Sequence, residues 1–148
     1  MPSGLPGAVL FCCTENSVRS PMAEGLMKQL LGHAVYVDSC GVRSRPVDGF
    51  SIAVMDELGI DVSRHSAKSF DDLEDSSFDV IITLSPEAQH KAVELTRTMA
   101  CDVEYWPTMD PSLTEGSRER RLESWRQVRD QLRKRILERF NPGPAPTV

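Results

Sequence analysis

One stretch decides the fold of this chain: residues 8–26, which read AVLFCCTENSVRSPMAEGL. It begins with an apolar run, residues 8–13, of the kind that forms a buried strand, and ends in a helical pattern whose first position is Pro21. The loop between them therefore closes on a helix N-terminus, where backbone N–H groups and the helix dipole favour a bound anion. The sequence predicts an anion-binding loop that starts at Cys13.

The residues of this loop point to sulfur chemistry on a tetrahedral oxyanion. Arg19 follows Cys13 by six positions, and its planar guanidinium can pair with two oxygens of a phosphate. The same positive surroundings favour the thiolate form of Cys13, which makes it a nucleophile. Ser20 has two open roles, as the helix N-cap or as a hydroxyl donor to the sulfur. The competing interpretation is a buried cysteine that ends a strand, beside an arginine on a solvated first turn.

Strand and helix signals alternate along the chain. Apolar runs predict strands over 8–13, 34–37, 78–84 and 103–106, and helices are expected after Ser20, Asp48, Ser85 and Ser117. This alternation favours an α/β fold, in which right-handed crossovers build a parallel sheet with helices on both faces. Ligands in such folds bind at the carboxyl ends of strands, which is where Cys13 lies.

Length and composition set further bounds. We expect 148 residues to form one domain over 1–148, with Gly- and Pro-rich flexible tails at 1–7 and 141–148. A net charge of −5 argues against a nucleic-acid partner, and the chain offers no transmembrane stretch or secretory signal, so no membrane partner and a cytoplasmic location are expected. In that compartment the four cysteines are expected to be free, and their spacing suggests no metal site.

Arginines crowd the last helical segment, interleaved with carboxylates. Two interpretations stay open for them, a basic docking surface and a solvated helix face with i,i+4 ion pairs. The residues concerned are Arg118, Arg120, Arg121, Arg126, Arg129, Arg133, Arg135 and Arg139.

Attack by sulfur on a phosphoester expels an alkoxide, which needs a proton. The best placed acid is Asp110, which precedes Pro111 on a long loop after a predicted strand. The competing interpretation is that the Asp-Pro pair simply starts a turn.

These motifs resemble one known family. Cys13 to Ser20, followed by Pro-Met-Ala-Glu at 21–24, resembles the phosphate-binding loop of low-molecular-weight protein tyrosine phosphatases, whose fold and loop thioredoxin-coupled arsenate reductases share. Further similarity lies at 38–41, 59–65, 78–84 and 106–111. The resemblance implies a three-layer sandwich with a four-stranded parallel sheet in the order 2-1-3-4.

The resemblance also implies roles for particular residues. Cys13 would form a phosphocysteine, Arg19 would bind phosphate and Asp110 would be the general acid, with no metal or other cofactor. Ser39 and His65 would hold Asn16 in place, and Ser20 would support the loop. The phosphate would contact the whole loop, namely Cys13, Thr14, Glu15, Asn16, Ser17, Val18, Arg19 and Ser20.

The chain also departs from the family pattern. Glu15 replaces a glycine, so its carboxylate is expected to point away from the anion, and Val18 replaces a second loop cysteine. Cys12 is expected to lie in the core, because adjacent strand residues face opposite sides. Ser112 and Leu113 replace tyrosines that flank an aryl phosphate, and residues 84–92 lack the cysteines that relay electrons in the thioredoxin-coupled reductases.

The leading functional hypothesis is therefore a phosphomonoester hydrolase that acts through a phosphocysteine on a phosphorylated protein or a small aryl phosphate. Inorganic phosphate or sulfate is expected to occupy the same loop. The first alternative is an arsenate reductase that uses an external thiol of the glutathione or mycothiol type. The second is a phosphate-recognising binding module with little turnover.

Overall fold

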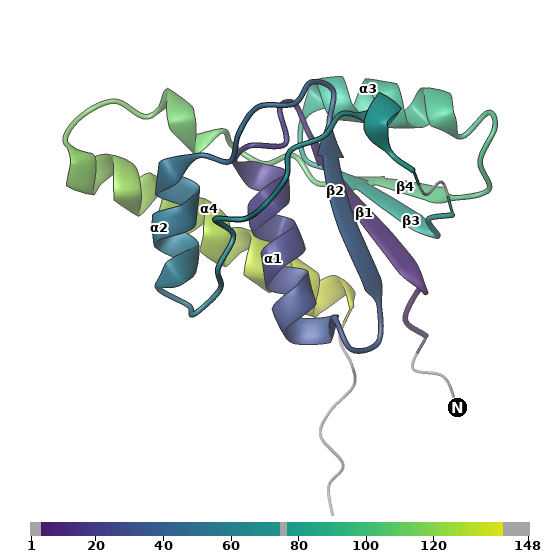
Figure 1. Cartoon of the computed structure of the whole chain (residues 1–148), viewed down its shortest axis with the longest axis horizontal. Coiled ribbons are helices and arrows are strands. Elements are labelled where there is room, and N and C mark those ends of the chain that lie inside the picture. Colours follow the sequence, from purple (N-terminus) through teal and green to yellow (C-terminus); the bar gives the residue numbers. More distant parts are fainter. Residues whose placement is uncertain (1–3, 75–76, 141–148) are drawn as a thin grey trace, which may run out of the picture.

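A computed structural model describes residues 4–74 and 77–140; residues 1–3 and 141–148 of the expected tails lie outside the described residues. Its centre is a parallel sheet of four strands in the order β2-β1-β3-β4, as predicted (Figure 1). The strands are β1 (Ala8–Cys13), β2 (Tyr36–Gly41), β3 (Val80–Thr83) and β4 (Asp102–Tyr105). The register pairs Cys12 with Cys40 on one side and with Thr83 on the other, so the loop after β1 lies at the middle of the sheet's carboxyl edge.

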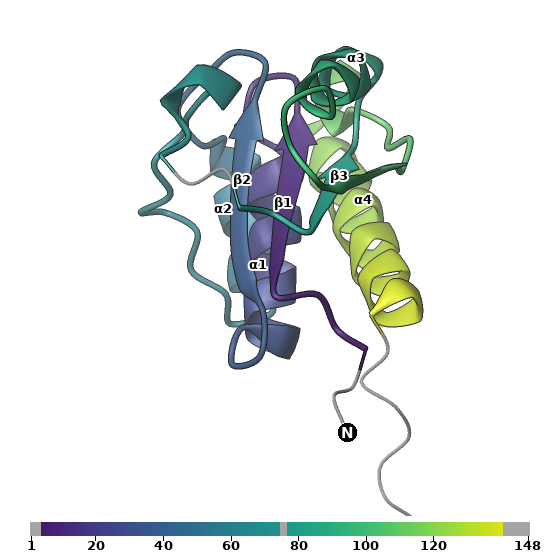
Figure 2. The ribbon, with the colours of Figure 1, turned by 90° about the vertical axis from the view of Figure 1, so that its right-hand side faces the viewer.

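Helices cover both faces of the sheet, which gives the predicted three layers (Figures 1 and 2). Helices α1 (Arg19–Leu31), α2 (Gly49–Asp56) and α4 (Arg118–Arg139) lie on one face, and α3 (Pro86–Leu95) lies on the other. The pleat of β1 sends Val9, Phe11 and Cys13 into the first core, and Leu10 and Cys12 into the second. Cys12 is fully buried there, so its expected core position is confirmed.

Two short 3-10 helices complete the described elements, η1 (Phe70–Asp72) and η2 (Pro111–Leu113). Of the helices within residues 4–74 and 77–140, none combines the length and the apolar composition that crossing a bilayer demands.

Local capping signals predicted three of the helix starts correctly. The side chains of Asp48, Ser85 and Ser117 accept hydrogen bonds from backbone N–H groups in the first turns of α2, α3 and α4. The capping role considered for Ser20 is wrong, because α1 already begins at Arg19 and Val18 is its N-cap residue. The other role left open for Ser20 agrees with the structure, because its hydroxyl oxygen lies 2.9 Å from the sulfur of Cys13.

The second strand also differs from its predicted range of 34–37. The N–H groups of Ala34 and Val35 both donate to the carbonyl oxygen of Leu31 at 2.9 Å, so these residues belong to the turn after α1. β2 consequently starts at Tyr36 and continues to Gly41, where its carboxyl end meets the loop after β1.

Part of the arginine-rich face of α4 joins that helix to α2. The buried Arg129 donates to the carbonyl oxygen of Val54 at 2.7 Å and to Glu57 at 2.8 Å, and Arg126 also binds Glu57. Hydrogen bonds from Arg126 and then Arg129 hold the pKa of Glu57 below its ordinary value. These two arginines therefore connect α4 to α2. This role differs from both interpretations of the arginines, a basic docking surface and a solvated helix face.

Trp125 of α4 fills the core between α2 and α4. Its ring is fully buried, lies 4.7 Å from the ring of Phe50 between centroids, and its indole N–H donates to the hydroxyl of Ser51. The side chain thus supplies both apolar area and a satisfied polar contact between the two helices.

We predict that Trp125→Ala lowers the free energy of unfolding by about 3–5 kcal/mol, because it leaves a cavity in the core. Chemical denaturation followed by circular dichroism measures this change. Leu137→Ala removes a more exposed side chain of the same helix and should cost less than about 1 kcal/mol. Equal costs for the two variants would contradict the central place of Trp125.

Candidate active site

The loop between β1 and α1 is held open by backbone hydrogen bonds on its outer side. The carbonyl oxygens of Cys13, Thr14 and Glu15 accept from N–H groups of the segment 42–45, at N···O distances of 3.1, 2.9 and 3.0 Å. Further along, the carbonyl oxygen of Ser17 accepts from the N–H of Asp48 at 3.0 Å. In a trans peptide the carbonyl and the following N–H point in opposite directions, and the described residues contain no cis peptide. The N–H groups that follow these carbonyls therefore point to the inside of the loop.

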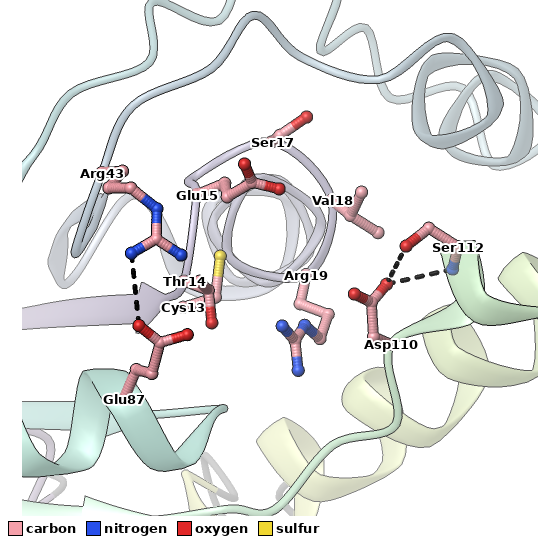
Figure 3. Close-up of a pocket in the computed structure, with 10 residues that line it drawn as sticks. All are labelled: Cys13, Thr14, Glu15, Ser17, Val18, Arg19, Arg43, Glu87, Asp110 and Ser112. Atoms are coloured by element: carbon pink, nitrogen blue, oxygen red, sulfur yellow. Dashed lines mark hydrogen bonds and ion pairs between the residues drawn. The ribbon is translucent and has the colours of Figure 1, made fainter.

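The sulfur of Cys13 lies at the floor of the cup that these groups form, as Figure 3 shows. The N–H of Asn16 points at it from 3.3 Å, and the Ser20 hydroxyl oxygen lies 2.9 Å away. Cys13 is only 2% exposed, and it lines a cavity of about 270 Å³. Residues 13–15 and 17–19 of the predicted phosphate-binding set line this cavity, whereas Asn16 and Ser20 lie behind it.

Arg19 and Asp110 reach the same cavity from different parts of the chain. A guanidinium nitrogen of the buried Arg19 donates to the carbonyl oxygen of Thr108 at 2.9 Å, which holds the head group between Cys13 and Asp110. One carboxylate oxygen of Asp110 accepts from the N–H and the hydroxyl of Ser112 at 3.0 and 2.6 Å. Its other oxygen faces the cavity in Figure 3. Asp110 therefore both starts a turn and lines the site, so the two interpretations of the Asp-Pro pair are compatible.

Asn16 holds the loop from behind, in the left-handed conformation with φ of 54°. The nitrogen of its side-chain amide, Nδ2, donates to the hydroxyl oxygens of Ser20 and Ser39 at 2.8 and 2.9 Å. The oxygen of the same side chain, Oδ1, accepts from Nε2 of His65 and from the backbone N–H of Lys68, both at 3.0 Å. The structure thus brings together the four residues expected to support the loop, Asn16, Ser20, Ser39 and His65. It adds Lys68, whose N–H fixes the orientation of the Asn16 side-chain amide.

Glu24 extends this network and was missed in the sequence. Its Oε1 accepts from the Ser39 hydroxyl at 2.5 Å and lies 3.7 Å from Nδ1 of His65. Burial lowers the pKa of His65, although the charge of Glu24 opposes this shift. The side-chain oxygen of Asn16 can only accept, so Nε2 of His65 donates to it. The only local signal for Glu24 is its position one helical turn after Ser20, on the same face of α1.

One ion pair, Arg43–Glu87, lines the mouth of the cavity, and a second, Arg45–Glu15, lies beside it through the lining residue Glu15. Arg43 contacts Glu87 of α3 at 3.2 Å, and Arg45 lies 3.7 Å from the carboxylate of Glu15. Glu15 is among the lining residues, and its carboxylate lies beside Arg45 outside the lining, so the expectation that it turns away from the anion stays a prediction. Sequence reasoning gave no role to Arg43, Arg45 or Glu87, because they meet only through the packing of separate loops.

No other cysteine lines the cavity in the part of the chain that the structure describes. The sulfurs of Cys12 and Cys40 lie 3.6 Å apart in the opposite core, and burial raises the pKa of the Cys12 thiol. Cys101 lies near β4 and is partly exposed. The described residues also contain no cluster of His, Cys, Asp and Glu side chains suited to a metal ion.

Gly41 permits the close approach of the loop to β2. A Cβ atom there would lie 2.5 Å from the carbonyl oxygen of Arg43 and 2.6 Å from the backbone nitrogen of Asn16. Neither contact can be relieved without moving the backbone of the loop or of the segment that holds it.

We predict that Gly41→Ala weakens phosphate binding at least about tenfold, because it displaces the inward N–H groups. Calorimetric titration with inorganic phosphate measures the affinity, and circular dichroism checks that the fold persists. Gly49→Ala is the matched control, since a Cβ at this position meets nothing within 4 Å. Unchanged affinity in a folded Gly41→Ala protein would exclude the loop as the anion site.

Comparison with known proteins agrees with this geometry. The sequence profile of the family "Low molecular weight phosphotyrosine protein phosphatase" matches residues 8–140. The arsenate reductase of Bacillus subtilis (strain 168) is 32% identical over 135 residues, which cover 91% of this chain and 96% of that protein. The glutaredoxin arsenate reductase of Synechocystis sp. is 35% identical over 129 residues, covering 86% and 92%.

Solved structures resemble the fold over the same length. An arsenate reductase in its phosphate binding state has a TM-score of 0.71 and 32% identity, covering 91% of this chain and 97% of its own. A low molecular weight protein tyrosine phosphatase from T. tengcongensis has a TM-score of 0.74 and 26% identity, covering 91% and 98%. Sequence match, fold and the loop at Cys13 agree, and the chain belongs to the low molecular weight phosphotyrosine protein phosphatase family.

Proposed function

We propose that this protein reduces arsenate at Cys13 with the help of an external thiol. The observation that carries the proposal is the lining of the cavity. Its described residues include Cys13 and no second cysteine that could act as an internal reductant. The names of the similar arsenate reductases support it, and they favour this alternative over the phosphomonoesterase that the sequence suggested first. The reaction requires a thiol-rich compartment, which agrees with the expected cytoplasmic location.

The lining of the cavity also disfavours an aryl phosphate. Its described residues are polar or charged except for Cys13 and Val18, and none is aromatic. Leu113, which replaces a tyrosine of the family pattern, is 77% exposed and points to solvent instead of narrowing the mouth. A small, charged oxyanion can accept hydrogen bonds from the inward N–H groups and from Arg19, whereas the ring of an aryl phosphate has no aromatic side chain to stack against.

The first chemical step is attack by sulfur. Arsenate lies on the inward N–H groups and the Arg19 guanidinium, and the Cys13 thiolate attacks arsenic. A sulfur–arsenic bond forms, and the departing hydroxide takes a proton from Asp110 and leaves as water. The Ser20 oxygen already accepts from the side-chain amide of Asn16, so its own proton can be donated to the sulfur 2.9 Å away, which is nearer than the alternative acceptor, the carbonyl oxygen of Cys40 at 3.4 Å.

The second step takes place from the cavity mouth. Behind the sulfur lie the Ser20 hydroxyl and the Asn16 N–H, so an external thiol reaches the adduct only on the side opposite Cys13. A new sulfur–arsenic bond forms there, the bond to Cys13 breaks, and its electron pair returns to Cys13. Asp110, now ionised, accepts the proton of the incoming thiol.

A second thiol completes the reduction. Its sulfur forms a disulfide with the first thiol, and arsenic keeps the electron pair of the broken bond and passes from As(V) to As(III). One arsenate and two thiols thus give one arsenite, one disulfide and one water.

We predict arsenite formation from arsenate with glutathione or mycothiol as the reductant, detected directly as arsenite. Cys13→Ser should reduce the rate to background, because the nucleophile is lost. Cys101→Ser, which alters a cysteine outside the cavity, should retain the wild-type rate. No arsenite from the wild type with either thiol would end the proposal, and phosphate binding without any turnover would indicate the binding module.

A second candidate, phosphomonoester hydrolysis, is favoured by the position of Asp110. The same cup and acid can form a phosphocysteine and protonate an alkoxide, and water at the mouth can then release phosphate. The family includes phosphatases of this architecture.

For this candidate we predict that Asp110→Asn lowers kcat/KM by about a hundredfold or more on poor leaving groups, and less on good ones. The asparagine keeps an oxygen for the N–H of Ser112, so the turn should persist. A series of aryl phosphates with graded leaving-group pKa measures the effect. Equal losses across the series would show that Asp110 is not the acid.

A further inference from the structure

We infer that the rim of the Cys13 cavity is the recognition site for the reducing thiol and that it selects a zwitterionic peptide thiol, the glutathione class. The rim consists of the lining residues Arg43, Glu15 and Glu87, together with Arg45, which lies 3.7 Å from the carboxylate of Glu15. This inference rests on the proposed arsenate reduction, and it decides between the two thiol types considered for it.

The backbone fixes the two arginines relative to the sulfur. The N–H of Arg43 donates to the carbonyl of Thr14 at 2.9 Å, and the N–H of Arg45 donates to that of Glu15 at 3.0 Å. The Cα atoms of both arginines are thus tied to the loop that carries Cys13. A ligand held by their guanidinium groups is positioned against the sulfur without reorganisation of the backbone.

The rim also lies at the open side of the cavity, from which the external thiol attacks the Cys13 adduct. In Figure 3, Arg43 and Glu87 lie on one side of the sulfur, and Asp110 lies on the opposite side. The thiol must enter between these sides, because the floor of the cavity is closed by Ser20 and Asn16. If the peptide backbone of the thiol compound contacts the rim, its sulfur would lie beside the carboxylate of Asp110, which accepts the thiol proton.

The charges of the rim match a particular ligand chemistry. Two arginines can pair with two carboxylates, and two glutamates can pair with one ammonium group. A γ-glutamyl tripeptide thiol carries this set of groups, with carboxylates at both ends and an ammonium beside one of them. A sugar thiol of the mycothiol type carries no carboxylate and no ammonium group, so it forms no ion pair with the rim.

Existing contacts at the rim are easily exchanged. The side chains of Arg43 and Glu87 are 58% and 55% exposed, and exposed ion pairs contribute little to stability. A ligand carboxylate can therefore replace Glu87 on Arg43, which frees Glu87 for the ammonium group. The ion pair between Arg43 and Glu87 therefore does not block the ligand.

The test compares thiols at saturating arsenate. The measured quantity is kcat/KM for glutathione divided by kcat/KM for the uncharged 2-mercaptoethanol. We expect Arg43→Ala to lower this ratio about tenfold, since one charge-assisted contact is lost. Glutathione diethyl ester, which lacks both carboxylates, should show at least this loss with the wild type and a smaller further loss when Arg43 is also removed. Arg133→Ala, an exposed arginine of α4 away from the cavity, should leave the ratio and both rates unchanged.

The outcomes separate the two proposals. Arsenite formation with 2-mercaptoethanol, together with an unchanged ratio in Arg43→Ala, would overturn the recognition site and leave the proposed function in place. A higher kcat/KM for mycothiol than for glutathione would also overturn it. No arsenite from the wild type with any thiol would remove the proposed function and the recognition site together. If Arg43→Ala does not fold, Glu87→Gln tests the same rim through loss of discrimination between glutathione and N-acetylglutathione.

Discussion

The hydrogen bonds between the loop after β1 and the segment 42–48 after β2 are the constraint on which the site depends. Four carbonyl groups of the loop, those of Cys13, Thr14, Glu15 and Ser17, are satisfied on the outside by this segment. Because each peptide is trans, satisfying the carbonyls outside turns the following N–H groups inside. Gly41 lets the two chains approach closely enough for these bonds to form. The cup is therefore a consequence of backbone pairing, and the helix dipole of α1 adds to it.

The same pairing places several other groups. It fixes the backbone of Arg43 and Arg45, so the seat of the oxyanion and the charged rim are built on one framework. Behind the loop, the amide of Asn16 uses both of its polar atoms to connect α1, β2 and the segment that follows α2. The two contacts of the side-chain nitrogen are buried and the contact with Lys68 is partly buried, and together they hold Asn16 in its left-handed conformation.

A single geometry can serve both hydrolysis and reduction. In either reaction a Cys13 adduct is open only on the side of the cavity mouth, and Asp110 lies there to handle a proton. Water arriving at the mouth would release phosphate, and a thiol arriving there would take over the arsenic. The identity of the second nucleophile then depends on what the rim binds. In this chain the rim is charged and lacks aromatic side chains, which favours a charged thiol over a phosphotyrosine-bearing substrate.

The sequence alone determined the parts of this protein that depend on neighbouring residues. The apolar run before Cys13 and the caps at Asp48, Ser85 and Ser117 were predictable, because strand burial and capping are local effects. Alternation of strands and helices indicated the α/β class, and the family resemblance supplied the strand order.

Only the tertiary structure decided which distant residues meet. Of the two roles open for Ser20, the structure selects the contact of its hydroxyl with the sulfur of Cys13. Glu24 of α1 accepts a hydrogen bond from Ser39 of β2. Both contacts join separate elements. The rim joins Arg43, from a loop after β2, to Glu87, from the first turn of α3. No periodicity or cap signal encodes such pairs, because side-chain contacts between separate elements are fixed by how the elements pack and not by spacing along the chain.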